Sequence, residues 1–371
     1  MRQELARPLL HRPPMRTIDP LLHETVARGA SDLHVTADSP PFLRIHGELL
    51  ALAHPPLSRA EARALCYGVL TEDQRRRFEH ERELDFAVAV PGLGRFRGNL
   101  YFTRGTVGGA FRVIPADLPV LDSLGLPPVV AGLAYMPRGL VLVSGATGSG
   151  KSTTLAAMVD HVNRERRGHI VSLEDPIEFL HEPRRCLVTQ RELTSDTGGF
   201  ARALRQVLRQ DPDVVLVGEM RDPETIEAAL TVAETGHLVL STLHTGSAVQ
   251  TITRIVDAFP PHQQAQVRAQ LSLVLQGVIA QQLVRRRDAT GRALAAEVMV
   301  ATPAIRNLIR EEKTHQVYSQ MQLAQGATGM QTMTRALIAL VERDLVTPDE
   351  AIARAIEPDE LRRQLAAVVG H

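Results

Sequence analysis

The fold of this 371-residue chain is decided by the stretch Gly145-Ala146-Thr147-Gly148-Ser149-Gly150-Lys151-Ser152, which follows the apolar run Leu140-Val-Leu-Val143. The eight residues match the phosphate-binding pattern G-x-x-x-x-G-K-[ST], and the apolar run supplies the strand that such a loop requires. Glycines let backbone N–H groups curve around phosphate oxygens, and a helix starting near Lys151 adds the positive end of its dipole. The stretch therefore predicts a nucleoside triphosphate site rather than a structural glycine turn.

A second apolar strand ends on a carboxylate. In Asp213-Val-Val-Leu-Val-Gly-Glu219 the strand delivers Glu219 to the carboxyl edge of the sheet, where ligands bind in open α/β folds. Lys151 can reach the β and γ phosphates, while Ser152 and Glu219 are candidates to hold Mg²⁺, Glu219 partly through water. A solvated surface glutamate is the alternative for Glu219.

Further candidates follow two other strands. Glu174 ends the run from His169 and is the candidate general base, with Asp175 and Glu178 as possible ligands of metal or water. His237 and His244 bracket the strand Leu238–Leu243. A neutral histidine can donate a hydrogen bond to a γ-phosphate, but a structural role for each is the alternative.

The composition excludes several classes of protein. The chain has 42 basic and 42 acidic side chains and 4% aromatic residues, so neither a basic track nor a stacking surface for nucleic acid is expected. Its two cysteines, Cys66 and Cys186, fit a reducing compartment and offer no zinc framework. No apolar stretch approaches the roughly 18 residues of a membrane helix.

The pattern of strands and helices predicts two domains after a flexible lead-in at 1–16. Residues 17–117 begin with a helix that ends near Gly29 and continue with short strands, which indicates a small α+β domain. The proline-rich passage 115–137 is interpreted as a linker without regular structure. From 118 to 371 strands and helices alternate around a mostly parallel sheet, and after Pro260-Pro261 the chain is predicted to be mainly helical.

Arginines gather on the strands of the first domain. Arg95 and Arg97 share one face by period-two alternation, and Arg112 lies on the next strand. They are candidate arginine fingers for an ATP site in a neighbouring subunit, with a solvated strand face as the equal alternative. Thr302-Pro303 starts a helix whose apolar stripe, taken alone, indicates docking on the core.

Together these residues resemble the type IV pilus retraction ATPases, the PilT family of the secretion ATPase superfamily. The resemblance covers nearly all of the chain after Met15. It is carried by a phosphate-binding segment that extends to Thr153 and Thr154, an Asp box at Leu173–Phe179, a Walker B segment at Asp211–Arg221, and a His box at Thr235–His244. The helix sequence Ala304-Ile-Arg-Asn-Leu-Ile309 is similar to a signature associated with retraction motors.

The resemblance implies an α/β fold, with a RecA-like P-loop ATPase domain preceded by a smaller PAS-like α+β domain. It further implies a cytoplasmic homohexamer at the inner-membrane pilus base that binds ATP and Mg²⁺ between subunits. An integral inner-membrane platform protein is the expected partner, with a paralogous motor as a further one. The rivals are an accessory retraction motor, a type II/IV secretion ATPase, and a scaffold that binds nucleotide with negligible turnover.

Overall fold

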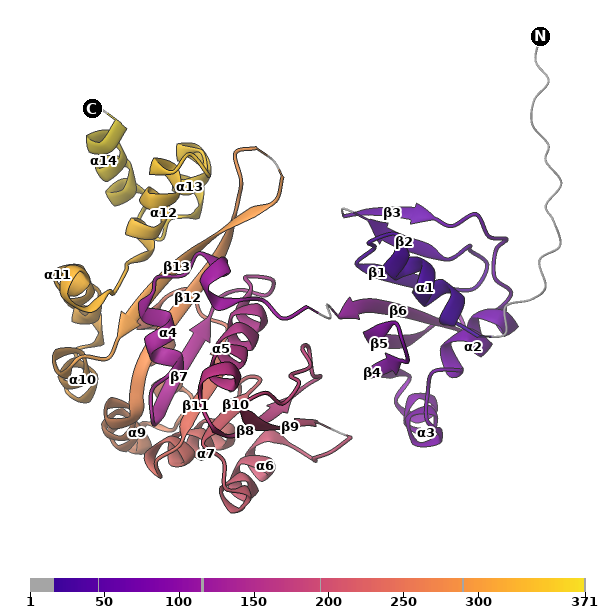
Figure 1. Ribbon diagram of the computed structural model, residues 1–371, viewed down its shortest axis with the longest axis horizontal. Coiled ribbons are helices and arrows are strands. Elements are labelled where there is room, and N and C mark those ends of the chain that lie inside the picture. The colour runs from indigo at the N-terminus through magenta and orange to yellow at the C-terminus, as the bar shows by residue number, and fades with distance from the viewer. Residues whose placement is uncertain (1–16, 46, 115–116, 194, 289, 370–371) are drawn as a thin grey trace, which may run out of the picture. The chain divides into compact units, whose positions relative to one another are not determined.

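The computed structural model describes residues 17–45, 47–114, 117–193, 195–288 and 290–369, and the predicted lead-in at 1–16 lies outside them. The described residues form two compact units, which divide between residues 114 and 117 (Figure 1). Within the described residues, no helix combines the length and apolar character needed to cross a bilayer.

The first unit, in its described part, is built on a six-stranded antiparallel sheet with the order β3-β2-β1-β6-β5-β4. Phe96, Leu100 and Phe111 are fully buried on one face of this sheet, against Leu22 and Phe78 from the helices. The α+β prediction is confirmed. The elements are α1 (Asp19–Ala27), β1 (Asp32–Val35), β2 (Phe42–Ile45), β3 (Glu48–Ala51), α2 (Arg59–Tyr67), α3 (Glu72–Glu81), β4 (Glu83–Val90), β5 (Gly94–Thr103) and β6 (Thr106–Ile114).

The second unit holds a seven-stranded sheet in its described part, with the order β13-β12-β7-β11-β10-β8-β9. Its strands pair in parallel except for β13, which is antiparallel to β12. The predicted α/β architecture is therefore confirmed. The elements that carry the site are β7 (Gly139–Ser144), α5 (Lys151–Glu165), β8 (Gly168–Glu174), β9 (Cys186–Glu192), α6 (Phe200–Val207), β10 (Val214–Val217), α7 (Pro223–Glu234), β11 (Leu238–Leu243), α8 (Ala248–Asp257), β12 (Leu275–Arg285) and β13 (Arg292–Val300).

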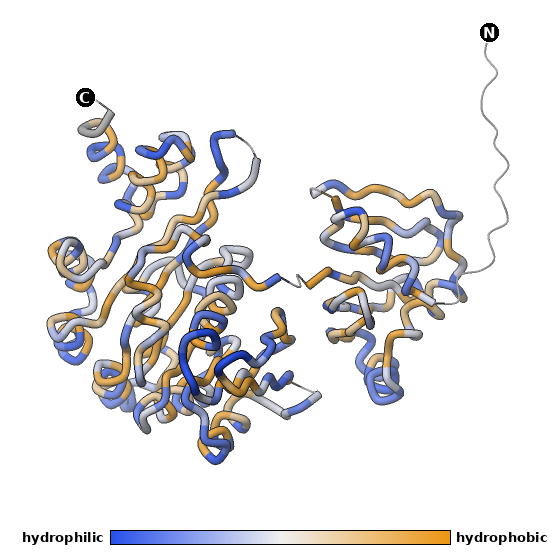
Figure 2. The backbone as a smooth tube through the Cα atoms, viewed as in Figure 1, coloured by the Kyte–Doolittle hydropathy of each residue, from blue (hydrophilic) through white to orange (hydrophobic). Residues whose placement is uncertain are grey.

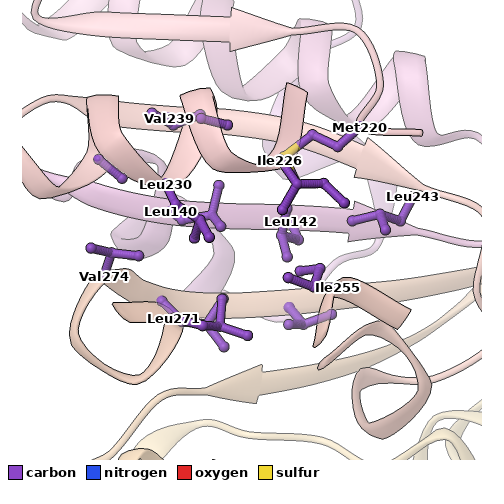
Figure 3. Packing of buried hydrophobic residues seen from close by; sticks show 14 of the residues in the cluster. Leu140, Leu142, Met220, Ile226, Leu230, Val239, Leu243, Ile255, Leu271 and Val274 are labelled. Atoms are coloured by element: carbon purple, nitrogen blue, oxygen red, sulfur yellow. The ribbon is translucent and has the colours of Figure 1, made fainter. Parts of the chain in front are cut away.

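The central strands are buried on both faces, which explains their unbroken apolar sequences. In β7, Leu140 and Leu142 pack into one cluster, and Val141 and Val143 pack into another on the opposite face. Figure 3 shows Leu140 beside Leu230 and Leu142 beside Ile226, all members of the first cluster. The apolar colour follows these strands, whereas α3 is mostly hydrophilic (Figure 2).

The proline-rich passage contains regular structure, so its prediction as an irregular linker is wrong. A 3₁₀ turn, η1 (Leu121–Leu124), is followed by α4 (Val129–Ala134), in which Val130 and Leu133 are buried. Pro128 immediately precedes α4. The prolines at 127 and 128 thus mark a helix start, where the missing N–H costs nothing, rather than a spacer.

The expectation of a mainly helical chain after Pro260-Pro261 is wrong for 275–300. Helix α9 (Pro261–Val274) is followed by β12 and β13, which extend the sheet beyond β7. Burial on both faces removes the alternation that would have identified these strands. Helices then resume with α10 (Pro303–Arg310), α11 (Val317–Thr328), α12 (Met333–Glu342), α13 (Pro348–Arg354) and α14 (Pro358–Val369).

Two predicted helix starts are confirmed by their caps. The Asp222 carboxylate accepts the Thr225 N–H at 2.8 Å before α7. The Thr302 hydroxyl accepts the Ile305 N–H at 3.4 Å before α10. Ile305 is fully buried, as the predicted apolar stripe requires.

Candidate nucleotide site

The loop between β7 and α5 has the geometry that its glycines predict. Gly145, Gly148 and Gly150 have φ angles of 145°, 78° and 91°, a region that side chains rarely adopt. A Cβ at Gly145 would also lie 2.4 Å from both the Gln281 carbonyl oxygen and Ser149 Oγ. The exposed rim at 146–148 and the start of α5 therefore form a cradle of backbone N–H groups that suits a triphosphate.

Lys151 is the first residue of α5 and only 8% exposed. Its Nζ donates to the carbonyl oxygens of Gly145 at 2.9 Å and Ala146 at 3.1 Å. Burial lowers the pKa of Lys151, while the carboxylates of Glu178 and Glu219 act in the opposite direction. A buried ammonium among backbone groups and two carboxylates fits a phosphate site, and the half-buried Ser152 and Thr153 follow in the same turn.

Glu219 lies just beyond β10, at the same sheet edge as the loop, because β7, β11, β10 and β8 are parallel neighbours (Figure 1). Its side chain is 20% exposed, and Oε2 lies 2.7 Å from Arg221 Nε and 3.5 Å from His244 Nε2. The Thr242 hydroxyl donates to the Gly218 carbonyl at 2.6 Å, which ties the two strand ends together. The structure therefore brings Glu219 and His244 to the phosphate-binding edge.

Glu174 ends β8 at this edge but is buried, with 9% of its surface exposed. Its Oε1 accepts hydrogen bonds from Ser172 Oγ at 2.6 Å and Gln190 Nε2 at 3.2 Å. Burial raises the pKa of Glu174 above its usual value, which suits a proton acceptor. Glu178, which the sequence marked only as a possible ligand, is the carboxylate of this segment that acts on Lys151.

Within this chain, His237 lies at the opposite edge of the sheet from His244. It precedes β11 and so lies at the amino edge of the sheet, about 20 Å from the strand's other end at roughly 3.3 Å per residue. Its Nδ1 lies 3.1 Å from the Val232 carbonyl oxygen and 3.2 Å from Thr235 Oγ1. In its own subunit His237 thus supports the end of α7.

The three candidate arginines lie on two paired strands of the first unit. Arg97 on β5 is directly opposite Arg112 on β6, and Arg95 is two residues earlier on β5. Arg112 Nε donates to Asp32 Oδ1 at 2.8 Å, and the Asp32 side chain is only 9% exposed. Arg112 is therefore anchored within its own sheet, and the action of these arginines on an ATP site stays a prediction.

Sequence reasoning missed the side chains that contact the strand and the helix on either side of the loop from neighbouring elements. Thr251 in α8 donates to Ser144 Oγ at 3.2 Å, and Gln281 in β12 donates to Thr154 Oγ1 at 2.7 Å. The only available signal was a polar residue in the apolar run of β12. The role of this polar residue depends on β12 lying next to β7, and the sequence does not reveal that strand order.

Comparisons with known proteins identify the family of this chain. Residues 128–352 match the family model described as Type II/IV secretion system protein. The chain is 49% identical over 342 residues to the type IV pilus retraction ATPase PilT of Pseudomonas aeruginosa, covering 92% of this chain and 99% of that one. It is 46% identical over 315 residues to a twitching motility protein of Neisseria gonorrhoeae, covering 85% and 84%. A crystal structure of the pilus retraction motor PilT with bound ADP aligns with a TM-score of 0.88 and 47% identity over 94% of this chain and 99% of that one.

The fold and the site thus define a P-loop ATPase of the type II/IV secretion system protein family. Within this family, the chain belongs to the PilT-type retraction ATPases of the type IV pilus. The family resemblance, fold class and ATPase activity predicted from the sequence are confirmed.

Proposed function

We propose that this ATPase works as a Mg²⁺-dependent homohexamer at the cytoplasmic face of the pilus base, and that it draws pilin subunits back into the inner membrane. The observation that carries the proposal is the meeting of Lys151, Glu219 and His244 at one sheet edge. A cation for phosphate and a carboxylate for metal or water then face the same space. Relatives named for pilus retraction and twitching motility support pilus retraction as the process that ATP hydrolysis drives.

In the proposed reaction, backbone N–H groups of residues 145–150 orient the phosphates, and Lys151 stabilises charge on the transferred group. Bound Mg²⁺ would neutralise phosphate charge, held by the Ser152 hydroxyl and by Glu219, partly through water. Glu174 would accept a proton from the attacking water, a role that its raised pKa suits.

Arginines from the first unit of a neighbouring subunit would complete each site. Arg97 is the leading candidate, because Arg112 is tied to Asp32. Force would pass to an integral inner-membrane platform protein, since pilin subunits return to the bilayer.

The test is deletion of the gene in its source bacterium, followed by restoration with the wild-type or the Lys151→Ala gene. Abundant surface pili without surface motility, corrected by the wild-type gene alone, are expected. Cells without pili would indicate an extension motor. Unchanged pili and motility would indicate an accessory motor or a secretion ATPase. The chain is also 42% identical to a protein described as type IV pilus ATPase PilU, so another pilus ATPase is the second candidate.

A further inference from the structure

Gln281 lies beside the first residue of the phosphate-binding loop. β12 pairs with β7 in parallel, with Ala280 opposite Ser144, so Gln281 is level with Gly145. The Gln281 carbonyl oxygen and Ser149 Oγ each lie 2.4 Å from the position of a Cβ at Gly145. These two atoms are therefore separated by no more than twice that distance, and only a glycine leaves room for both residues.

Gln281 and Ser149 each also have a buried side-chain polar atom without a partner in the described part of the chain. Gln281 is 3% exposed and Ser149 is 5% exposed. Gln281 Nε2 donates to Thr154 Oγ1, but Gln281 Oε1 and Ser149 Oγ have no hydrogen-bond partner among the residues that the structure describes. An unpaired buried polar atom costs about 1–3 kcal/mol. One of the two atoms is a carbonyl acceptor, and the other belongs to a hydroxyl that can donate to it.

The present contacts of the loop compete with phosphate binding. Lys151 Nζ donates to the carbonyl oxygens of Gly145 and Ala146, and the Ser149 N–H donates to Ala146 at 3.1 Å. A lysine that turns to a phosphate gives up these two carbonyl partners, which releases the loop backbone at Gly145 and Ala146. Ser149, whose N–H is bonded to Ala146, would move with any adjustment of that backbone.

We propose that, in the phosphate-bound arrangement, the Ser149 hydroxyl donates to Gln281 Oε1. Gln281 is then a positioning residue that holds the loop on its phosphates from strand β12. The pairing satisfies both buried atoms at once, so its free energy contributes to nucleotide affinity and not to the stability of the nucleotide-free protein. The inference rests on the nucleotide site alone and is independent of the pilus and of the hexamer.

The test is a double-mutant cycle with Ser149→Ala and Gln281→Met, read by ADP affinity in the full chain with Mg²⁺ present. Each variant should weaken ADP binding about five-fold, and the double variant about five-fold as well, rather than the about 25-fold expected of independent effects. Without ADP, Ser149→Ala should leave the melting temperature unchanged or raise it, because it removes an unpaired hydroxyl.

Two further variants separate this role from simple bracing of α5. Thr154→Val removes the other partner of Gln281 and should show no coupling to Ser149→Ala. Gln282→Ala changes the neighbouring carboxamide, whose Nε2 donates to the Arg354 carbonyl, and should leave ADP affinity unchanged. The proposal is overturned if the Ser149 and Gln281 effects on ADP affinity multiply, or if Thr154→Val alone reproduces the loss seen in Gln281→Met. If the Ser149–Gln281 pairing is wrong, the two variants lose ADP affinity independently while pilus retraction by the wild-type protein is unaffected. This outcome differs from a failure of the proposed function.

Discussion

His244 Nε2 lies 3.5 Å from Glu219 Oε2, at the carboxyl ends of β11 and β10. His237, at the other end of β11, contacts the end of α7 instead. One strand therefore carries two histidines to opposite edges of the sheet. Of the two, only His244 lies at the sheet edge that carries the phosphate-binding loop and Lys151.

We expect His244→Ala to lower the rate of ATP hydrolysis by at least about ten-fold, because it removes the imidazole beside Glu219. His237→Ala should leave ADP affinity within about two-fold of wild type, since its contacts lie at the distant edge. Phosphate release and ADP titration check the pair. Unchanged hydrolysis in His244→Ala, or a loss of ADP affinity beyond about two-fold in His237→Ala, would contradict the separation of the two histidines.

Glu219→Gln should keep nucleotide binding but lower hydrolysis by about 100-fold or more, because the carboxylate charge is lost at the phosphate edge. Arg221→Ala is the matched control, since Arg221 forms the 2.7 Å pair with Glu219 from outside the loop. Its side chain is 73% exposed, so the effect of its removal should be small. The alternative is a scaffold that binds nucleotide with negligible turnover. It would be favoured if phosphate release proceeded at the same background rate in Glu219→Gln, Lys151→Ala and wild type.

Mixing two inactive variants tests whether Arg97 acts on a neighbouring subunit. Arg97→Ala lacks the arginine and Lys151→Ala lacks the loop lysine. If the site is shared, an intact site needs Lys151 from one subunit and Arg97 from its neighbour. In a ring assembled at random from equal amounts of the two variants, about one interface in four meets this condition. Activity should therefore reappear on mixing. If the mixture of assembled rings stays inactive, Arg97 acts within its own subunit or outside the reaction.

Much of this arrangement could be predicted because its signals are local. The loop glycines, Lys151, and the caps at Asp222 and Thr302 act within a few residues of their own positions, so a sequence displays them directly. The edge shared by Glu174 and Glu219 also followed, since parallel strands end on the same side.

The failures share a different cause, which is dependence on distant partners. Strands β12 and β13 are buried on both faces, so their apolar runs show no period. Asp32 anchors Arg112 across 80 residues of sequence, and Gln281 contacts Thr154 of α5 across more than 100 residues. Such roles appear only once the sheet order is known.

A buried histidine makes the stability of the second unit depend on pH. His181 is 7% exposed, and burial lowers its pKa from 6.5 to about 4, although Asp160 acts to raise it. Asp160 is itself paired with Arg164 and Arg184. As pH falls below 6.5, the unfolded chain binds the proton first, so the contribution of His181 is complete above pH 6.5 and is lost towards pH 4.

By this linkage, wild type should lose about 2 kcal/mol between pH 7.5 and pH 5 through His181 alone. His181→Gln removes that titration but keeps the backbone N–H that donates to Gln190 at 2.8 Å. Urea unfolding at both pH values measures the difference, and the other titrating groups cancel when the variant is compared with wild type. The free energy of unfolding should therefore fall less in His181→Gln than in wild type. An equal fall in both proteins would mean that His181 is protonated as readily in the folded chain as in the unfolded one.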